Sequence, residues 1–216
     1  MAIGLLGKLP SHGDFLRRGV AAELADPLDA WIAAAVAASR ETLGEGWLDA
    51  YLTAPVWRFA LAAGSCGPAA AAGIWLPSVD RVGRYYPLLA VTPLAAMPSP
   101  VTLLLGGRAW YDRVEELVLA VLDDHLNLPV LEAGLAAIAP PEPLAGAGPL
   151  PWRLAPADPA GWQLAALAPI GSLWWGEGSP RVPASLLACA GLPPPAAFAA
   201  MLDGGFPTRG WSESAA

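Results

Sequence analysis

Two short segments carry the residue types that could support chemistry. The first, Ser11-His12-Gly13-Asp14, contains the three side chains of a hydrolytic triad, and His12 could act as a general base. Adjacent residues rarely form such a triad, because its side chains must converge from different segments of the chain. The alternative is a turn in which Asp14 accepts backbone hydrogen bonds and Gly13 takes a positive φ. We favour the turn.

The second segment, residues 77–89, concentrates charge in a chain of which only 14% is charged. It contains Asp80, Arg81 and Arg84, and apolar residues flank it on both sides. Burying such charges is costly unless they pair or bind a partner. Asp80 could pair with either arginine in a structural loop, or act as a base beside an arginine clamp for an anion. Arginines next to Tyr85 would also suit an interface. We favour the structural role, followed by partner binding.

No other pattern in the sequence predicts a catalytic set, a metal or a cofactor. His12 and His125 are the only histidines, and together with Cys66 and Cys189 they lack the spacing of zinc ligands. Residues 123–125, Asp-Asp-His, are interpreted as a solvated helix end. The glycines form neither a dinucleotide fingerprint nor a phosphate-binding loop.

Composition narrows the class of protein. The 216 residues are 55% hydrophobic and carry a net charge of −7, which disfavours disorder and a nucleic-acid partner. The charge deficit lies in residues 112–216, where eleven acidic residues oppose four basic ones. Two lone cysteines indicate a reducing compartment. The N-terminus lacks the pattern of a secretory signal.

Two long uncharged runs, between Arg84 and Arg108 and between Arg181 and Asp203, could be mistaken for membrane spans. Several prolines interrupt each run, so neither could form a continuous spanning helix. We interpret both as buried strands and loops. The sequence therefore predicts no membrane-spanning segment.

Strands and helices alternate along the chain, which predicts a layered α/β domain. The short turn at residues 64–68 favours antiparallel pairing there, so we expect a mixed sheet. One domain should cover residues 1–216, with a variable Pro/Ala-rich loop near residues 139–161. The predicted strands cover residues 3–6, 56–61, 71–76, 85–92, 162–167 and 172–175. The predicted helices cover residues 26–43, 47–52, 108–126 and 195–202. Asp26-Pro27 marks the start of the first, because proline suits the first helical position.

Several motifs together resemble one family. They are Gly7-Lys-Leu-Pro-Ser-His-Gly-Asp-Phe15, Trp57-Arg-Phe59, the segment 77–89, Ser172-Leu-Trp-Trp175 and Gly191-Leu-Pro193. In this order and spacing they resemble TagF, also called ImpM, a family of type VI secretion system-associated proteins. The resemblance extends over nearly the whole chain and is weakest at residues 139–161.

The resemblance implies a three-layer α/β sandwich without established catalytic residues. It also implies a cytoplasmic accessory protein that represses type VI secretion post-translationally through a forkhead-associated (FHA) domain scaffold. The alternatives are a structural component of the secretion apparatus and a hydrolase using His12 and Asp80. The candidate partner-binding residues are His12, Asp14, Asp80, Arg81, Arg84 and Tyr85.

Overall fold

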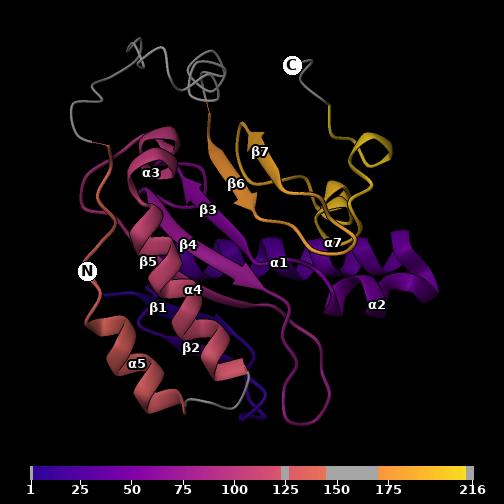
Figure 1. Cartoon of the computed structure of the whole chain (residues 1–216), viewed down its shortest axis with the longest axis horizontal. Helices are drawn as coiled ribbons and strands as arrows, with labels where there is room; N and C mark the ends of the chain where they lie inside the picture. The colour runs from indigo at the N-terminus through magenta and orange to yellow at the C-terminus, as the bar shows by residue number, and fades with distance from the viewer. Residues whose placement is uncertain (1, 123–126, 145–169, 213–216) are drawn as a thin grey trace.

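A seven-stranded sheet forms the centre of the protein (Figure 1). The structure, a computed structural model, describes residues 2–122, 127–144 and 170–212. Within them the strand order is β2-β1-β5-β4-β3-β6-β7. The strands are β1 (Gly4–Gly7), β2 (Leu16–Arg18), β3 (Trp57–Leu61), β4 (Ala71–Leu76), β5 (Leu88–Pro93), β6 (Ser172–Gly176) and β7 (Ser185–Cys189).

Every strand pair in the described residues is antiparallel, so the prediction of a mixed sheet was wrong. That prediction assumed that helices between strands produce parallel crossovers. Instead, strands that follow one another without a helix, such as β3, β4 and β5, pair directly as hairpins. The helices join strands that are not neighbours in the sheet, such as β2 and β3. Antiparallel neighbours need only short connections, which this arrangement uses.

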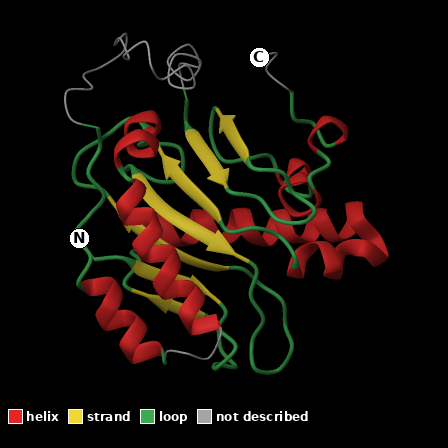
Figure 2. Cartoon of the chain, viewed as in Figure 1, coloured by secondary structure: helices red, strands yellow, loops and turns green. Residues whose placement is uncertain are grey.

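Helices cover both faces of the sheet (Figure 2). One face packs against α1 and α2, together with the C-terminal α7, and the other against α3, α4 and α5. This confirms the predicted three-layer α/β sandwich. The helices are α1 (Ala22–Leu43), α2 (Trp47–Leu52), α3 (Pro100–Gly106), α4 (Arg108–Leu122), α5 (Leu128–Ala136) and α7 (Ala200–Asp203), with 3-10 turns η1 (Gly44–Gly46), η2 (Pro195–Ala197) and η3 (Phe206–Thr208).

Alternation along the strands divides the core into two halves. In β3, the side chains of Trp57 and Phe59 enter the half under α1, whereas Ala60 enters the half under α4. Successive strand residues point to opposite faces, so one buried strand supplies both halves. Trp57 also donates its indole hydrogen to the Met201 carbonyl of α7 at 3.0 Å. The C-terminal segment is thereby attached to the centre of the sheet.

The first long helix starts earlier than predicted. It begins at Ala22 rather than at Asp26-Pro27, and Pro27 lies in its second turn. Leu24 and Ala25 are buried against the sheet, so the extra turn gains core contacts that outweigh the one backbone hydrogen bond Pro27 cannot donate. Asp26 therefore does not cap the helix and instead pairs with Arg17 at 2.6 Å on the surface.

Three further predictions differ from the structure or lie outside it. The strand predicted at residues 85–92 begins only at Leu88, and it lies between β1 and β4 in the sheet. Helices α3 and α5 were not predicted, although Ser99 and Asn127 cap their first turns. The predicted strand 162–167 and the His125 cluster lie outside the described residues, as does most of the predicted loop 139–161.

Candidate functional site

The loop of residues 77–87 connects β4 to β5 and extends beyond the ends of these strands (Figure 1). We call it the signature loop. An isolated bridge joins Val79 to Tyr85, and the Asp80 amide donates to the Arg84 carbonyl at 3.0 Å. Gly83 takes a φ of +86°, a conformation that favours glycine, and completes the turn. The four residues of the tip, 81–84, are all exposed.

The buried carboxylate of Asp80 holds this tip in place. Its Oδ1 accepts the Arg84 amide at 2.8 Å and the Val82 amide at 3.1 Å. Its Oδ2 accepts the Arg84 Nε at 2.6 Å and the Lys8 ammonium. The side chain of Asp80 has no exposed surface, so it needs all of these donors to remain charged. The structural role predicted for Asp80 and Arg84 agrees with these contacts.

The same contacts determine the ionisation of Asp80. Burial alone would raise the pKa of its carboxyl group. The hydrogen bonds from Lys8, Arg84 and Val82 outweigh burial, and they hold the pKa well below its usual value. Asp80 is therefore a carboxylate at any physiological pH, and it has no proton to donate.

The signature loop packs against the turn that follows β1. We call this turn, residues 8–15, the N-terminal turn. The Arg81 amide donates to the His12 carbonyl at 3.1 Å, and the Arg84 guanidinium donates to the Gly13 carbonyl. Ser78 Oγ donates to the Lys8 carbonyl at 2.8 Å. The two segments are joined because β1, which precedes the turn, pairs with β5, which follows the loop.

Aromatic residues support the base of the loop from behind. The Tyr51 hydroxyl on α2 donates to the Ser78 carbonyl at 2.9 Å and accepts from the Ser78 amide at 3.0 Å. Tyr85 packs edge-on against Tyr51 and Trp47, with ring centroids 6.0 Å apart in both pairs. The Tyr86 hydroxyl reaches the Asp29 carboxylate on α1. Burial, followed by this hydrogen bond, raises the pKa of Tyr86.

The six candidate residues thus have different environments. Asp80 is buried, Tyr85 is half-buried in the aromatic support, and Arg81 and Arg84 belong to the exposed tip. Residues 11–14 do form a turn, in which the His12 amide donates to the Leu9 carbonyl at 3.0 Å and Asp14 is exposed. Two details of the predicted turn were wrong, because Gly13 does not take a positive φ and no backbone amide of the described residues donates to Asp14. The structure brings all six into two segments that touch, so the proximity that partner binding needs is present.

A hydrolytic pair of His12 and Asp80 does not fit this geometry. The carboxylate of Asp80 is already engaged by Lys8 and Arg84, and the His12 Nδ1 lies 2.9 Å from Ser11 Oγ. Neither cleft described below includes either residue in its lining. The contact that His12 makes with the signature loop uses its backbone carbonyl, not its ring.

Sequence reasoning missed several residues of this site. Lys8 was not linked to Asp80 because 72 residues separate them, although it is the only lysine of the chain. Phe15 and Val82 were not recognised as exposed apolar residues beside the arginines. Tyr51 was predicted in a helix, but its contact with the loop depends on the tertiary fold.

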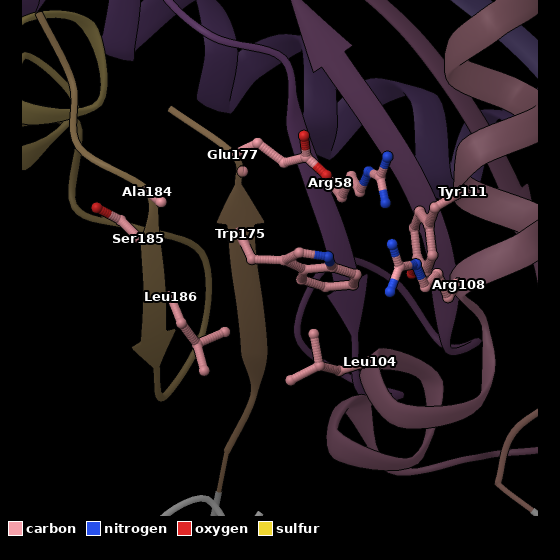
Figure 3. A pocket seen from close by; sticks show the side chains of 10 residues that line it. Arg58, Leu104, Arg108, Tyr111, Trp175, Glu177, Ala184, Ser185 and Leu186 are labelled. Carbon is pink, nitrogen blue, oxygen red and sulfur yellow. The ribbon is translucent and has the colours of Figure 1, made fainter. Parts of the chain in front are cut away.

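A cleft lies over β3, β6 and β7, toward the β7 edge of the sheet (Figure 3). This cleft, about 550 Å³ in volume, has an apolar wall that includes Trp175, and Tyr111 packs edge-on against that indole at 4.7 Å. Arg58 also lines it and pairs with Asp112 and Glu115, both at 2.8 Å. Burial would lower the pKa of Arg58, but these carboxylates raise it. Because its charge is compensated within the chain, Arg58 is better suited to packing than to proton transfer.

A smaller cleft of about 190 Å³ lies between two proline-rich loops, near Leu94 and Pro140. Among residues 2–122, 127–144 and 170–212, no group of three His, Cys, Asp or Glu side chains is arranged to hold a metal ion. In the same ranges, no helix is both long enough and apolar enough to cross a membrane.

Comparison with known proteins identifies the class. The crystal structure of PA0076 from Pseudomonas aeruginosa PAO1 superposes with a TM-score of 0.81 and 39% identity over 94% of each chain. The family model of the TagF N-terminal domain, described as type VI secretion system-associated, matches residues 4–138. The N-terminal turn and the signature loop both lie within this range. No curated protein matches the chain.

The protein is therefore an accessory protein of type VI secretion. It belongs to the TagF N-terminal domain family, which confirms the resemblance found in the sequence motifs.

Proposed function

We propose that this protein is a post-translational negative regulator of type VI secretion, and that it acts in the cytoplasm by binding an FHA-domain scaffold of the same system. The proposal combines the family membership with the surface formed by the signature loop and the N-terminal turn. It assigns the protein a binding role and no catalytic one. The candidate contacts are the exposed side chains of that surface.

The observation that carries the proposal is the use of a buried carboxylate to hold an exposed tip. Asp80 accepts hydrogen bonds from two backbone amides of residues 81–84, so contacts within the protein restrain the tip in the absence of a partner. A surface that is already ordered loses less conformational entropy on binding. Core packing alone would not require an exposed tip. This arrangement therefore favours recognition of a partner.

The role of the site in the proposal can be tested with two matched variants. Asp80→Asn removes the charge that holds the tip. Asp203→Asn removes a comparable carboxylate, which pairs with Arg209 and accepts the Gly205 amide at 2.9 Å far from the site in sequence. We expect Asp80→Asn to weaken binding of the purified FHA-domain protein and Asp203→Asn to leave it unchanged.

The measurement is isothermal titration calorimetry at micromolar concentrations, together with secretion by cells that overproduce each variant. We expect the wild type to bind and to lower secretion, and Asp80→Asn to do neither while remaining folded. A wild type that neither binds the FHA-domain protein nor lowers secretion would contradict the proposed function. Equal binding by the two variants would move the contact surface away from the signature loop.

A further inference from the structure

The proposed binding surface carries more positive charge than its own residues neutralise. Lys8 and Arg84 share the single carboxylate of Asp80, and Arg81 forms no ion pair with any described residue. Three cations therefore face one buried anion, which leaves a surplus of two charges. Asp14 in the N-terminal turn and Asp29, which accepts a hydrogen bond from Tyr86 at the base of the loop, offset this surplus, but the exposed tip, residues 81–84, carries two arginines and no acidic residue. The protein as a whole has a net charge of −7, so a cationic surface is a local exception.

The arginines of this surface lie close together. A Cβ built on Gly13 would lie 4.0 Å from an Arg81 guanidinium nitrogen, and the Gly13 carbonyl accepts a hydrogen bond from Arg84. Both guanidinium groups therefore lie over the N-terminal turn. Nearby Arg17 is already paired with Asp26 at 2.6 Å and contributes no surplus. The surplus is thus confined to the tip and the turn.

Two exposed apolar side chains accompany these cations. Val82 is 65% exposed at the tip, and Phe15 is 42% exposed at the end of the N-terminal turn. Tyr86 holds the Phe15 ring edge-on, with the centroids 5.4 Å apart. The Val82 amide is bound by Asp80, and a β-branched side chain has few rotamers to lose. Both apolar side chains are therefore exposed yet restrained, as the anchor residues of protein interfaces are.

We propose that this surface docks on an acidic face of the partner protein, with Arg81 paired to carboxylates and Val82 in an apolar depression between them. The inference rests on the proposed function and specifies the chemistry of its partner. A membrane is a poorer fit, because lipid binding through cations uses clusters of about four to eight lysines or arginines. Nucleic acid is a poorer fit because binding through its phosphates uses several lysine or arginine contacts, more than this surface leaves uncompensated.

The test measures association of the purified full chain with the purified FHA-domain scaffold by surface plasmon resonance at low and high salt. We expect Arg81→Glu to weaken binding at least tenfold, mainly through a slower association rate, and Arg81→Lys to retain most of it. Raising the salt concentration should weaken the wild type more than Arg81→Glu. Val82→Asp should also weaken binding at least tenfold, mainly through faster dissociation.

Arg108→Glu is the matched control, because Arg108 is 84% exposed in its side chain and lies on α4, outside the site. Wild-type binding that survives both Arg81→Glu and Val82→Asp would overturn this inference and leave the proposed function standing. An equal loss with Arg108→Glu would also overturn it, because a diffuse charge effect would then suffice. A wild type that does not bind would overturn the proposed function and the inference with it.

Analytical sedimentation of the protein alone tests whether a second copy of the chain binds this surface. If the wild type self-associates and Arg81→Glu makes it monomeric, a second copy of the acidic chain occupies the surface, and the acidic-partner inference is overturned. Circular dichroism and melting temperature confirm that each variant is folded. Both substituted side chains are exposed and form no hydrogen bond or ion pair with any described residue, so we expect unchanged melting.

Discussion

Removing the Tyr51 hydroxyl tests whether one side chain on α2 holds the base of the signature loop. In Tyr51→Phe the Ser78 carbonyl keeps the Tyr86 amide as a donor at 3.1 Å, so about 1 kcal/mol is lost there. The Ser78 amide has Tyr51 as its acceptor at 3.0 Å, and it would become a buried donor without a partner in the described structure. Such a group costs about 1–3 kcal/mol. The free energy of unfolding should therefore fall by about 2–4 kcal/mol.

Urea unfolding followed by tryptophan fluorescence measures this loss directly. A domain of this size loses about 2–4 °C of melting temperature per kcal/mol, so thermal unfolding should shift by about 4–16 °C. Tyr85→Phe is the control, because the Tyr85 ring belongs to the same aromatic cluster and its hydroxyl has no hydrogen bond within the described residues. A Tyr51→Phe protein that unfolds within about 1 °C of the control would refute the reasoning.

Three further predictions concern the backbone, pH and the thiols. Gly7→Ala should lower the free energy of unfolding, measured in urea, by about 3 kcal/mol or more. The φ of Gly7 is +121°, and the new Cβ would lie 2.0 Å from the Pro87 carbonyl oxygen of the signature loop. Gly46→Ala is the control and should be neutral, because no atom lies within 4 Å of its new Cβ. Asp80 has a lower pKa folded than unfolded, so its stabilisation is complete above the unfolded pKa of about 3.9 and disappears as the pH falls through the folded value. The stability difference between the wild type and Asp80→Asn should therefore shrink between pH 5 and pH 2 in acid-unfolding titrations, and a constant difference would contradict this sign. Burial raises the pKa of Cys66 and of Cys189 to about 11, so at pH 8 both should react with a disulfide reagent on the order of a hundredfold more slowly than an unfolded control; rapid labelling of the native protein would count against it.

Local patterns predicted the elements whose contacts are local. The strands at residues 57–61 and 71–76 and the helix at 47–52 were found because short apolar runs end at glycine or proline signals. The start of α1 was misplaced because the capping signal at Asp26-Pro27 is local, whereas burial of Leu24 depends on the sheet. The direction of strand pairing also depends on which strands become neighbours, and the order of elements along the chain does not determine this.

The candidate site was predictable in its residue types and not in its connections. Apolar residues flank Asp80 in the sequence, so a compensating positive charge was predicted, and Arg84 was among the expected partners. Lys8 was not, because the pairing of β1 with β5 brings it to Asp80. The exposure of Val82 could not be inferred either, because valine is usually buried and only the glycine turn beside it places it outside.

The pairing of β1 with β5 has a consequence for synthesis of the protein. The N-terminal turn is translated first, but its partner strand is complete only once Pro93 has been added. Until then the strand pairing that brings Asp80 beside Lys8 is incomplete, and the tip of the signature loop lacks part of its support. The composite surface therefore requires that β5 has been made and has paired with β1. A partner that contacts both segments together would therefore not bind unfolded copies, or chains too short to contain β5.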